Sequence, residues 1–208
     1  MRYKLALFDF DGTLADTADW FTSALNESAA RFGFRQLSRE EFAMLRSKDN
    51  REIIRYLRVP WWKMPAIARD MRQRSAANAH DMKLFPGVGE LLADLRGAGV
   101  RIAIVSSNAE STIRSVLGGD IEIDYFECGA SIFGKSARFR RVLRRAGLSV
   151  ADAIAIGDEG RDIEASRAAG IVAGAVAWGY ATPDYLESQS PDIMFGNVSD
   201  IRRTLLQA

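Results

Sequence analysis

The sequence predicts an α/β protein in which helices cover both faces of a parallel sheet and an all-helical segment follows the first strand. Two observations predict this fold class. From residue 86 onward, short apolar runs alternate with helical patterns, as in proteins built on parallel sheets. Residues 16–85 contain helical patterns with no strand-like runs between them. We therefore expect a three-layer α/β/α core made of residues 1–15 and 86–208, with residues 16–85 as a helical insertion.

The first predicted strand is an apolar run that ends at two carboxylates one residue apart, Asp9 and Asp11. Both would point the same way only while the strand continues, and Gly12 ends it. Open α/β sheets bind ligands at the carboxyl ends of their strands. Two carboxylates there suit one nucleophile and one acid/base acting on the same substrate. For this pair alone, an exposed Asp-Gly turn is the alternative interpretation.

The inserted segment contains four helical patterns, at residues 17–32, 39–45, 50–57 and 65–80. Ser38 and Glu41 have the spacing of a capping box at the start of the second pattern. Residues 16–85 hold 13 Lys and Arg against 9 Asp and Glu, a net charge of +4, whereas the rest of the chain has a net charge of −3. A cationic insertion beside an acidic core suits an anionic ligand held between them.

Strands and helices alternate in the remainder of the chain. Helices are expected at residues 88–96, 110–117, 136–146, 161–169 and 199–206, and strands at residues 100–105, 153–156 and 171–176.

Polar residues follow two of these strands and open one of the helices. Ser106 and Ser107 follow the strand at 100–105, and Asp158 follows the strand at 153–156, with Asp162 in the first turn of the next helix. Lys135 opens the helix at 136–146. If the strands are parallel, these residues converge with Asp9 and Asp11 on one crevice.

The residue types in this crevice are those that phosphoryl transfer needs. Asp9 and Asp158 can hold a hard cation such as Mg²⁺, which prefers oxygen ligands. Lys135 and the hydroxyl of Ser106 can neutralise and bind phosphoryl oxygens, where transition-state stabilisation is chiefly electrostatic. Each of these residues has an ordinary structural explanation on its own, and the order and placement of the whole set favour the functional interpretation.

The composition argues against several other kinds of site. Cys128 and His80 are the only cysteine and histidine, which excludes an internal disulfide and a multi-histidine zinc site. A Ser-His-Asp triad would depend on His80 alone, and the chain has no Gly-x-Ser-x-Gly elbow. No apolar run is long enough to cross a membrane, and Met1 leads into the first strand without a signal-peptide pattern. We expect a cytoplasmic protein with no membrane partner, as a monomer or homodimer.

Nucleic acid is not an expected partner either. The net charge of +1 favours neither the presence nor the absence of one. Residues 138–145 contain five arginines, but Val142, Leu143 and Ala146 give the same helix an apolar face. We therefore expect a solvated basic face there.

Four motifs in this order resemble those of a known superfamily. They are the run Asp-Phe-Asp-Gly-Thr-Leu at 9–14, Ser106 at a strand end, Lys135, and Gly157-Asp158 with Asp162 and Ala168-Ala169-Gly170. Together they resemble the haloacid dehalogenase superfamily of phosphohydrolases, in particular its phosphoglycolate-phosphatase-like members. The resemblance covers nearly the whole chain. It implies a Rossmann-like core, a helical cap inserted after the first motif, Mg²⁺ as the cofactor and a small-molecule phosphate ester as the substrate.

The resemblance also implies a role for each motif residue. Asp9 would be the nucleophile that takes the phosphoryl group as an aspartyl phosphate. Asp11 would protonate the leaving alcohol and then activate the hydrolytic water, which requires a raised pKa that crowding by like charge can supply. Asp9, Asp158 and the backbone carbonyl of Asp11 would bind Mg²⁺. The residues that would bind phosphate are Gly12, Ser106, Ser107 and Lys135. Thr13, Glu159 and Asp162 would support the site, and Asp162 would orient Lys135 or a metal-bound water.

The chain departs from the family pattern at two places. Ser136-Ala137 follows Lys135 where the family usually has Pro-x-Pro, and Glu159 stands where a serine is common. The first departure concerns the placement of Lys135, and the second concerns the surroundings of the metal.

Substrate choice is expected to depend on the polar cluster between the second and third helical patterns, which includes Arg46, Lys48, Asn50 and Arg51. In capped relatives this region faces the active site and senses the organic part of the substrate. Its cations favour a leaving group with a second anionic or hydroxylated end. A solvated loop between two helices is the alternative interpretation.

Rival functions differ in how well they fit the motifs. A dehalogenase of the same fold does not need the second acid, Asp11. A phosphomutase would share every core residue, so the motifs do not exclude it. A phospho-accepting receiver module combines similar groups in another order and has no helical insertion after its first strand. A non-catalytic binding descendant remains an alternative, although all the expected reactive groups are present.

Overall fold

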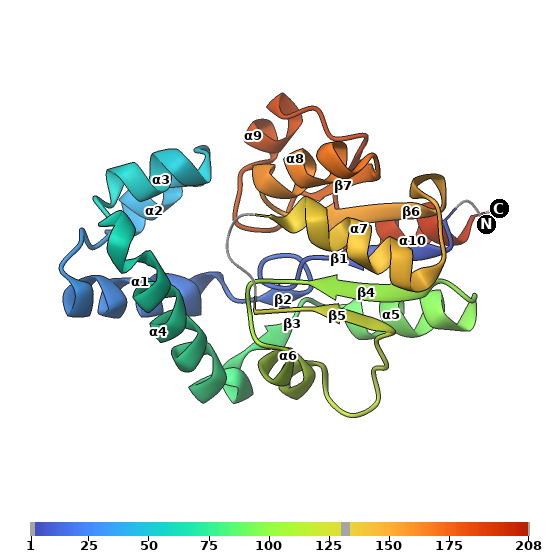
Figure 1. Cartoon of the computed structure of the whole chain (residues 1–208), viewed down its shortest axis with the longest axis horizontal. Coiled ribbons are helices and arrows are strands. Elements are labelled where there is room, and N and C mark those ends of the chain that lie inside the picture. Colours follow the sequence, from blue (N-terminus) through green and yellow to red (C-terminus); the bar gives the residue numbers. More distant parts are fainter. Residues whose placement is uncertain (1–2, 130–133, 208) are drawn as a thin grey trace.

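The computed structural model describes residues 3–129 and 134–207. Residues 1–2, 130–133 and 208, which belong to the predicted core, lie outside the described part. Within it, six strands form one parallel sheet in the order β5-β4-β1-β6-β7-β8 (Figure 1). The strands are β1 (Leu5–Phe8), β4 (Arg101–Val105), β5 (Tyr125–Glu127), β6 (Ala153–Gly157), β7 (Val172–Val176) and β8 (Ile193–Phe195). The α/β fold class predicted from the alternation of strands and helices is confirmed.

The central strand β1 is buried along its whole length between β4 and β6. Strands covered on both faces are continuously apolar instead of alternating, which is why Leu5–Phe8 contains no polar residue. One face of the sheet packs against the helices α5 (Val88–Gly97), α6 (Glu110–Leu117) and α10 (Val198–Leu206). The other face packs against α7 (Lys135–Ala146) and α8 (Gly160–Ala169). These two packed faces are the expected α/β/α layers.

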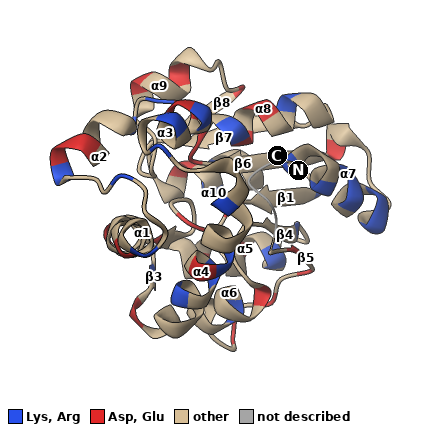
Figure 2. Ribbon diagram, turned by 60° about the vertical axis from the view of Figure 1, so that its left-hand side comes forward, with Lys and Arg blue, Asp and Glu red and all other residues tan. Residues whose placement is uncertain are grey.

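Helix α7 is amphipathic, as its sequence predicts. Phe139, Val142, Leu143 and Ala146 are buried against the sheet. Its arginines occupy the opposite side of the helix, and Figure 2 shows them as basic bands on the outside of the molecule.

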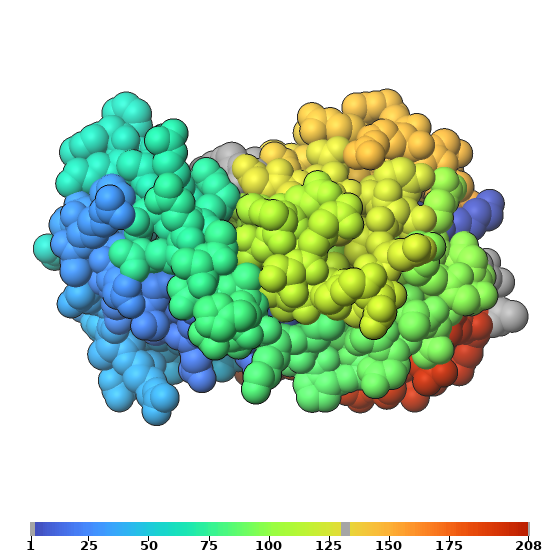
Figure 3. Space-filling model, turned by 90° about the horizontal axis from the view of Figure 1, so that it is seen from below, coloured from blue at the N-terminus to red at the C-terminus, as the bar shows by residue number. Residues whose placement is uncertain are grey.

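The inserted segment, residues 16–85, forms four α-helices: α1 (Ala18–Phe32), α2 (Arg39–Leu45), α3 (Asn50–Tyr56) and α4 (Met64–Ala77). The expected capping box at Ser38 starts α2. These helices enclose a small core of their own around Phe34, Leu37 and Leu57. They lie beyond the carboxyl ends of the sheet strands, and in Figure 3 they pack against the rest of the molecule.

The two chain connections between the sheet and the inserted segment lie side by side. β2 (Ala15–Asp16) and β3 (Lys83–Leu84) pair as an antiparallel ribbon. This pairing supports a division of the chain near residues 15 and 85, which we keep as a proposal for the boundary between core and cap.

Several short elements were not predicted from the sequence. Strands β5 and β8 have three residues each and lie at the two edges of the sheet, where the apolar run is too short to show a period. The ribbon β2–β3 and helix α9 (Pro183–Ser188) are also short. The expected helix at 65–80 ends at Ala77, and a 3₁₀ turn (Ala79–Asp81) follows it. None of the helices in the described ranges is both long and apolar enough to span a membrane.

Candidate active site

The predicted site residues gather at the carboxyl edge of the sheet. Asp9 follows β1, Ser106 follows β4, and Asp158 follows β6. Phe8 pairs in register with Ile104 on one side and with Ile156 on the other. Because the three strands run in parallel and end at nearly the same level, their polar successors meet at one place.

Asp9 is buried, with 4 % of its surface exposed. Its Oδ1 accepts a hydrogen bond of 2.8 Å from the backbone N–H of Phe10, and its Oδ2 lies 2.8 Å from Nζ of Lys135. Lys135 Nζ also lies 2.5 Å from Oδ1 of Asp162. Burial disfavours the charged lysine, but the charges of Asp162 and Asp9 outweigh it and raise the pKa of Lys135. The lysine therefore stays protonated beside Asp9 in spite of the changed Ser136-Ala137 sequence.

Asp158 is completely buried and held at both oxygens. Thr13 donates its hydroxyl to Oδ1 at 2.8 Å, and the backbone N–H of Tyr180 donates to Oδ2 at 2.8 Å. Burial raises the pKa of Asp158 well above its ordinary value, and the charges of Glu159 and Asp9 raise it further. A carboxylate buried in this way is suited to face a cation.

Two glycines make room for Asp158. Gly12 has φ of 75°, in the left-handed region, and a Cβ there would lie 2.2 Å from Oδ2 of Asp158. A Cβ at Gly179 would lie 2.1 Å from Cβ of Asp158. The observed contribution of Gly12 is this close approach of the turn to Asp158, whereas phosphate binding by Gly12 stays a prediction.

Asp11 occupies the turn after β1 and is half-buried. Its Oδ2 accepts a long hydrogen bond of 3.4 Å from Nδ2 of Asn108, and its Oδ1 is buried with no hydrogen-bond partner in residues 3–129 and 134–207. Burial raises the pKa of Asp11 from 3.8 to about 7, and the neighbouring charge of Asp9 adds to the shift. A carboxyl group with this pKa can give and take a proton near neutral pH.

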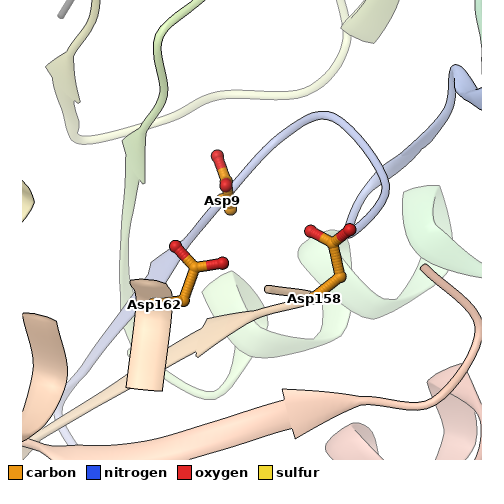
Figure 4. A group of neighbouring side chains, drawn as sticks. All are labelled: Asp9, Asp158 and Asp162. Atoms are coloured by element: carbon orange, nitrogen blue, oxygen red, sulfur yellow. The ribbon is translucent and has the colours of Figure 1, made fainter. Parts of the chain in front are cut away.

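Three carboxylates form a cluster that could hold a metal ion. Ligand oxygens of Asp9, Asp158 and Asp162 lie within 4.8 Å of one another (Figure 4). Such a set of hard oxygen ligands suits Mg²⁺, and a cation there would offset the burial of Asp158. The cluster contains the carboxylate of Asp162, whereas the family resemblance implies the backbone carbonyl of Asp11 as the third ligand.

Ser106 and Ser107 lie on the opposite side of the site from Asp158. The buried Ser106 accepts a hydrogen bond of 3.0 Å at Oγ from the backbone N–H of Asn108. Its hydroxyl proton is thus left to donate elsewhere. Ser107 lines the cavity described next.

A cavity of about 660 Å³ joins the strand ends to the inserted helices. Its core side includes Asp11, Ser107 and Lys135, and its other side includes Trp20 and Met71. The predicted specificity residues Arg46, Lys48, Asn50 and Arg51 all line it.

The sequence model of the haloacid dehalogenase-like hydrolase family matches residues 6–176, which is most of the chain. The chain belongs to this family.

Two curated relatives of this hydrolase are named for different activities. It is 30% identical over 204 residues to the phosphoglycolate phosphatase of Synechococcus elongatus, covering 97% of this chain and 96% of that protein. It is 29% identical over 210 residues to the tyrosine-protein kinase PtkA of Mycobacterium tuberculosis (strain ATCC 25618 / H37Rv), covering 97% of this chain and 72% of that protein. The crystal structure of a predicted phosphatase from Clostridium acetobutylicum shares the fold, with a TM-score of 0.83, 19% identity and full coverage of both chains.

Arg46 of the hydrolase is more constrained than a residue of a solvated loop. Its Nε donates to the carbonyl of Tyr180 at 2.9 Å, and its Nη2 donates to the carbonyl of Gly179 at 3.1 Å. The backbone N–H of Thr182 donates to the carbonyl of Arg46 at 3.0 Å. Arg46 thus joins the inserted segment to the loop after β7, whereas Lys48 and Arg51 are exposed at the cavity wall.

Four further residues lie in the site and were not predicted from the sequence. Asn108 contacts Asp11, and Arg161 lies near Asp9. Tyr180 donates its backbone N–H to Asp158 and shares a hydrogen bond of 2.6 Å between its hydroxyl and that of Thr17. Arg161 stands between Asp158 and Asp162 of a recognised motif, and Asn108 stands two residues after Ser106, so their positions in the sequence could have indicated them. Thr17 and Tyr180 are 163 residues apart, so only the fold brings them together.

Proposed function

We propose that this hydrolase is a Mg²⁺-dependent phosphatase that acts on small-molecule phosphate monoesters through an aspartyl phosphate on Asp9. The observation that carries the proposal is the contact of 2.8 Å between Asp9 Oδ2 and Lys135 Nζ beside the carboxylate cluster. A nucleophilic carboxylate and a cation for the phosphoryl oxygens are therefore in contact, and the cation lines a cavity.

In the first step, Oδ2 of Asp9 attacks the phosphorus and the bond to the leaving oxygen breaks. Asp11, protonated in part because its pKa is about 7, gives its proton to that oxygen. In the second step, the Asp11 carboxylate takes a proton from water, which attacks the phosphorus and releases inorganic phosphate and free Asp9. Mg²⁺ held by Asp9, Asp158 and the Asp11 carbonyl or Asp162 would neutralise charge on the transferred group.

The direct test is release of inorganic phosphate from a panel of phosphate monoesters by the purified protein. The panel includes 2-phosphoglycolate, because a relative is named phosphoglycolate phosphatase, together with sugar phosphates, nucleotides and p-nitrophenyl phosphate. We expect hydrolysis in Mg²⁺, loss of hydrolysis in excess chelator, and recovery when Mg²⁺ is restored. Transfer of the phosphoryl group to a second hydroxyl without phosphate release would indicate a phosphomutase. Full activity in chelator would contradict the metal dependence.

We further propose that Lys48 and Arg51 select the organic part of the substrate. Both are exposed cations on the wall of the cavity. Replacing either by Ala is expected to lower kcat/KM for the preferred panel substrate by about 10- to 100-fold, because one lost charged contact is worth about 1.5–3 kcal/mol. The small p-nitrophenyl phosphate, which has no second anionic end for these cations to bind, should lose less than about threefold.

Arg55 provides a matched control for this prediction. It is an exposed arginine one turn further along α3 and is not part of the cavity lining. Arg55→Ala should change neither substrate. Equal losses for both substrates in Lys48→Ala or Arg51→Ala, or no loss for either, would place these residues outside the site.

A further inference from the structure

A second cation approaches the reactive oxygen of Asp9. Arg161 is the second residue of α8, and its Nη2 lies 3.9 Å from Asp9 Oδ2. Lys135, the first residue of α7, lies 2.8 Å from the same oxygen. A group bonded to Oδ2 would therefore lie beside both cations, which come from the starts of two different helices.

The guanidinium of Arg161 has unused donor capacity. Its Nε is buried and has no hydrogen-bond partner in the part of the chain that the structure describes. The side chain is only 26 % exposed and lines the cavity. A buried donor without a partner is costly unless a ligand satisfies it. Guanidinium donors have the fork geometry that matches the oxygens of a phosphoryl group.

Glu159 holds Arg161 in this position. The Glu159 carboxylate forms an ion pair with Nη2 of Arg161, and the Glu159 backbone N–H donates to Asp162 Oδ2 at 3.1 Å. Glu159 is the residue that replaces the serine common in the family, and the arginine stands two positions after it. Glu159, which departs from the family pattern, is therefore ion-paired with Arg161, whose guanidinium approaches the nucleophile Asp9.

Carboxyl groups outnumber cations in the site. Among the described residues, the nucleophile and four neighbouring carboxyl groups face two cations: Asp9, Asp11, Asp158, Glu159 and Asp162 against Lys135 and Arg161. A phosphate ester that enters this site carries further negative charge. Without Arg161, Lys135 would be the one side-chain cation among these residues to compensate it, and Lys135 already contacts two carboxylates.

We propose that Arg161 binds the phosphoryl group during its transfer, together with Lys135, and that Glu159 is the positioning residue for Arg161. This inference rests on the proposed phosphatase function and names a catalytic residue of the same site. Arg161 keeps its proton throughout. Its N–H groups donate to phosphoryl oxygens, whose negative charge they stabilise as the bond to the leaving oxygen breaks.

The test combines turnover with a binding measurement that needs no turnover. Binding of inorganic phosphate in the presence of Mg²⁺ is measured by calorimetry for the wild type, Arg161→Met, Arg161→Lys and Glu159→Gln. Arg161→Met should weaken phosphate binding by about 10-fold and lower kcat by about 100-fold, as for loss of one transition-state donor. Arg161→Lys should recover part of the affinity for phosphate and little of kcat, because Lys keeps the charge but lacks the fork.

A double-mutant cycle separates positioning by Glu159 from a purely structural role. Glu159→Gln should lower kcat in the wild type but have almost no further effect in Arg161→Met, because it acts through the arginine. Arg144→Met, at an exposed arginine of α7, is the matched control and should change neither binding nor kcat. Melting temperatures of all variants report whether the fold is retained.

Three results would overturn the proposal. The first is wild-type phosphate affinity and kcat in a folded Arg161→Met variant. The second is a loss specific to one organic substrate with unchanged phosphate affinity, which would assign Arg161 to the leaving group. The third is absence of phosphate binding by the wild type. If phosphate binding depends on Arg161 but no panel substrate is hydrolysed, the phosphate site stands and the proposed phosphatase function fails.

Discussion

Asp9→Asn is expected to abolish turnover, with a loss of at least about 10⁴-fold in kcat, as for removal of a covalent nucleophile. The amide has nearly the same shape as the carboxylate and can still accept the hydrogen bond from the N–H of Phe10. Lys135 keeps its contact with Asp162. The variant should therefore fold as the wild type does, which circular dichroism and the melting temperature will check.

The phosphoenzyme gives this prediction a second measurement. Rapid acid quenching with radiolabelled substrate should trap a phosphorylated wild-type protein and leave Asp9→Asn unlabelled. Asp16→Asn, at an exposed carboxylate seven residues further along the chain, is the matched control and should be labelled normally. Wild-type hydrolysis by folded Asp9→Asn would refute the assignment of the nucleophile.

Asp11→Asn is expected to slow reactions of poor leaving groups most, by about 10²- to 10⁴-fold, the usual contribution of a general acid or base. Alkyl phosphates need a proton on the departing oxygen, whereas p-nitrophenolate leaves without one. Single-turnover formation of the phosphoenzyme should therefore be slowed strongly for an alkyl phosphate and weakly for p-nitrophenyl phosphate. Hydrolysis of the phosphoenzyme should be slow from both substrates because the base is missing. An equal loss of phosphoenzyme formation for both would contradict this role.

The raised pKa of Asp11 also fixes the direction of the pH dependence. With a pKa of about 7 instead of 3.8, the acid form predominates below pH 7 and the carboxylate above it. Phosphoenzyme formation from alkyl phosphates should fall as the pH rises through 7, because the proton donor is lost. Dephosphorylation should fall as the pH decreases through 7, because the base becomes protonated. Asp11→Asn should remove both dependences, which single-turnover measurements from pH 5 to 9 will check.

The convergence of the site could be predicted because it depends on few structural facts. Asp9, Ser106 and Asp158 each follow an apolar run, and parallel strands bring their carboxyl ends to one edge. This convergence depends neither on the exact lengths of the strands nor on the order of the outer ones. The prediction therefore holds although β5 and β8, at the sheet edges, were missed. The chemical roles of these residues stay predictions.

The direction of long side chains could not be predicted in the same way. Arg161 and Arg46 each have several rotatable bonds. Arg161 approaches the carboxylate of Asp9, and Arg46 donates to the backbone carbonyl of Tyr180, and both partners are far away in the sequence. Nothing in a local pattern says that Arg161 turns toward Asp9 or that Arg46 reaches the carbonyls of residues 179 and 180. The hydrogen bond between Thr17 and Tyr180 likewise exists only once the loop after β7 is in place.

The hydrogen bonds of Arg46 have a consequence for the order of binding events. Three of them join the end of α2 to residues 179–182, and the same loop donates the Tyr180 N–H to Asp158. A movement of α2 away from this loop would break these bonds and remove part of the support of the loop that holds Asp158. If Asp158 binds a metal ion as proposed, its affinity for that ion and the affinity of the cavity beside α2 for substrate would be thermodynamically linked, and each would strengthen the other by the same factor. Such an enzyme would bind the metal most tightly while substrate is present, and one opening event would both release product and weaken metal binding.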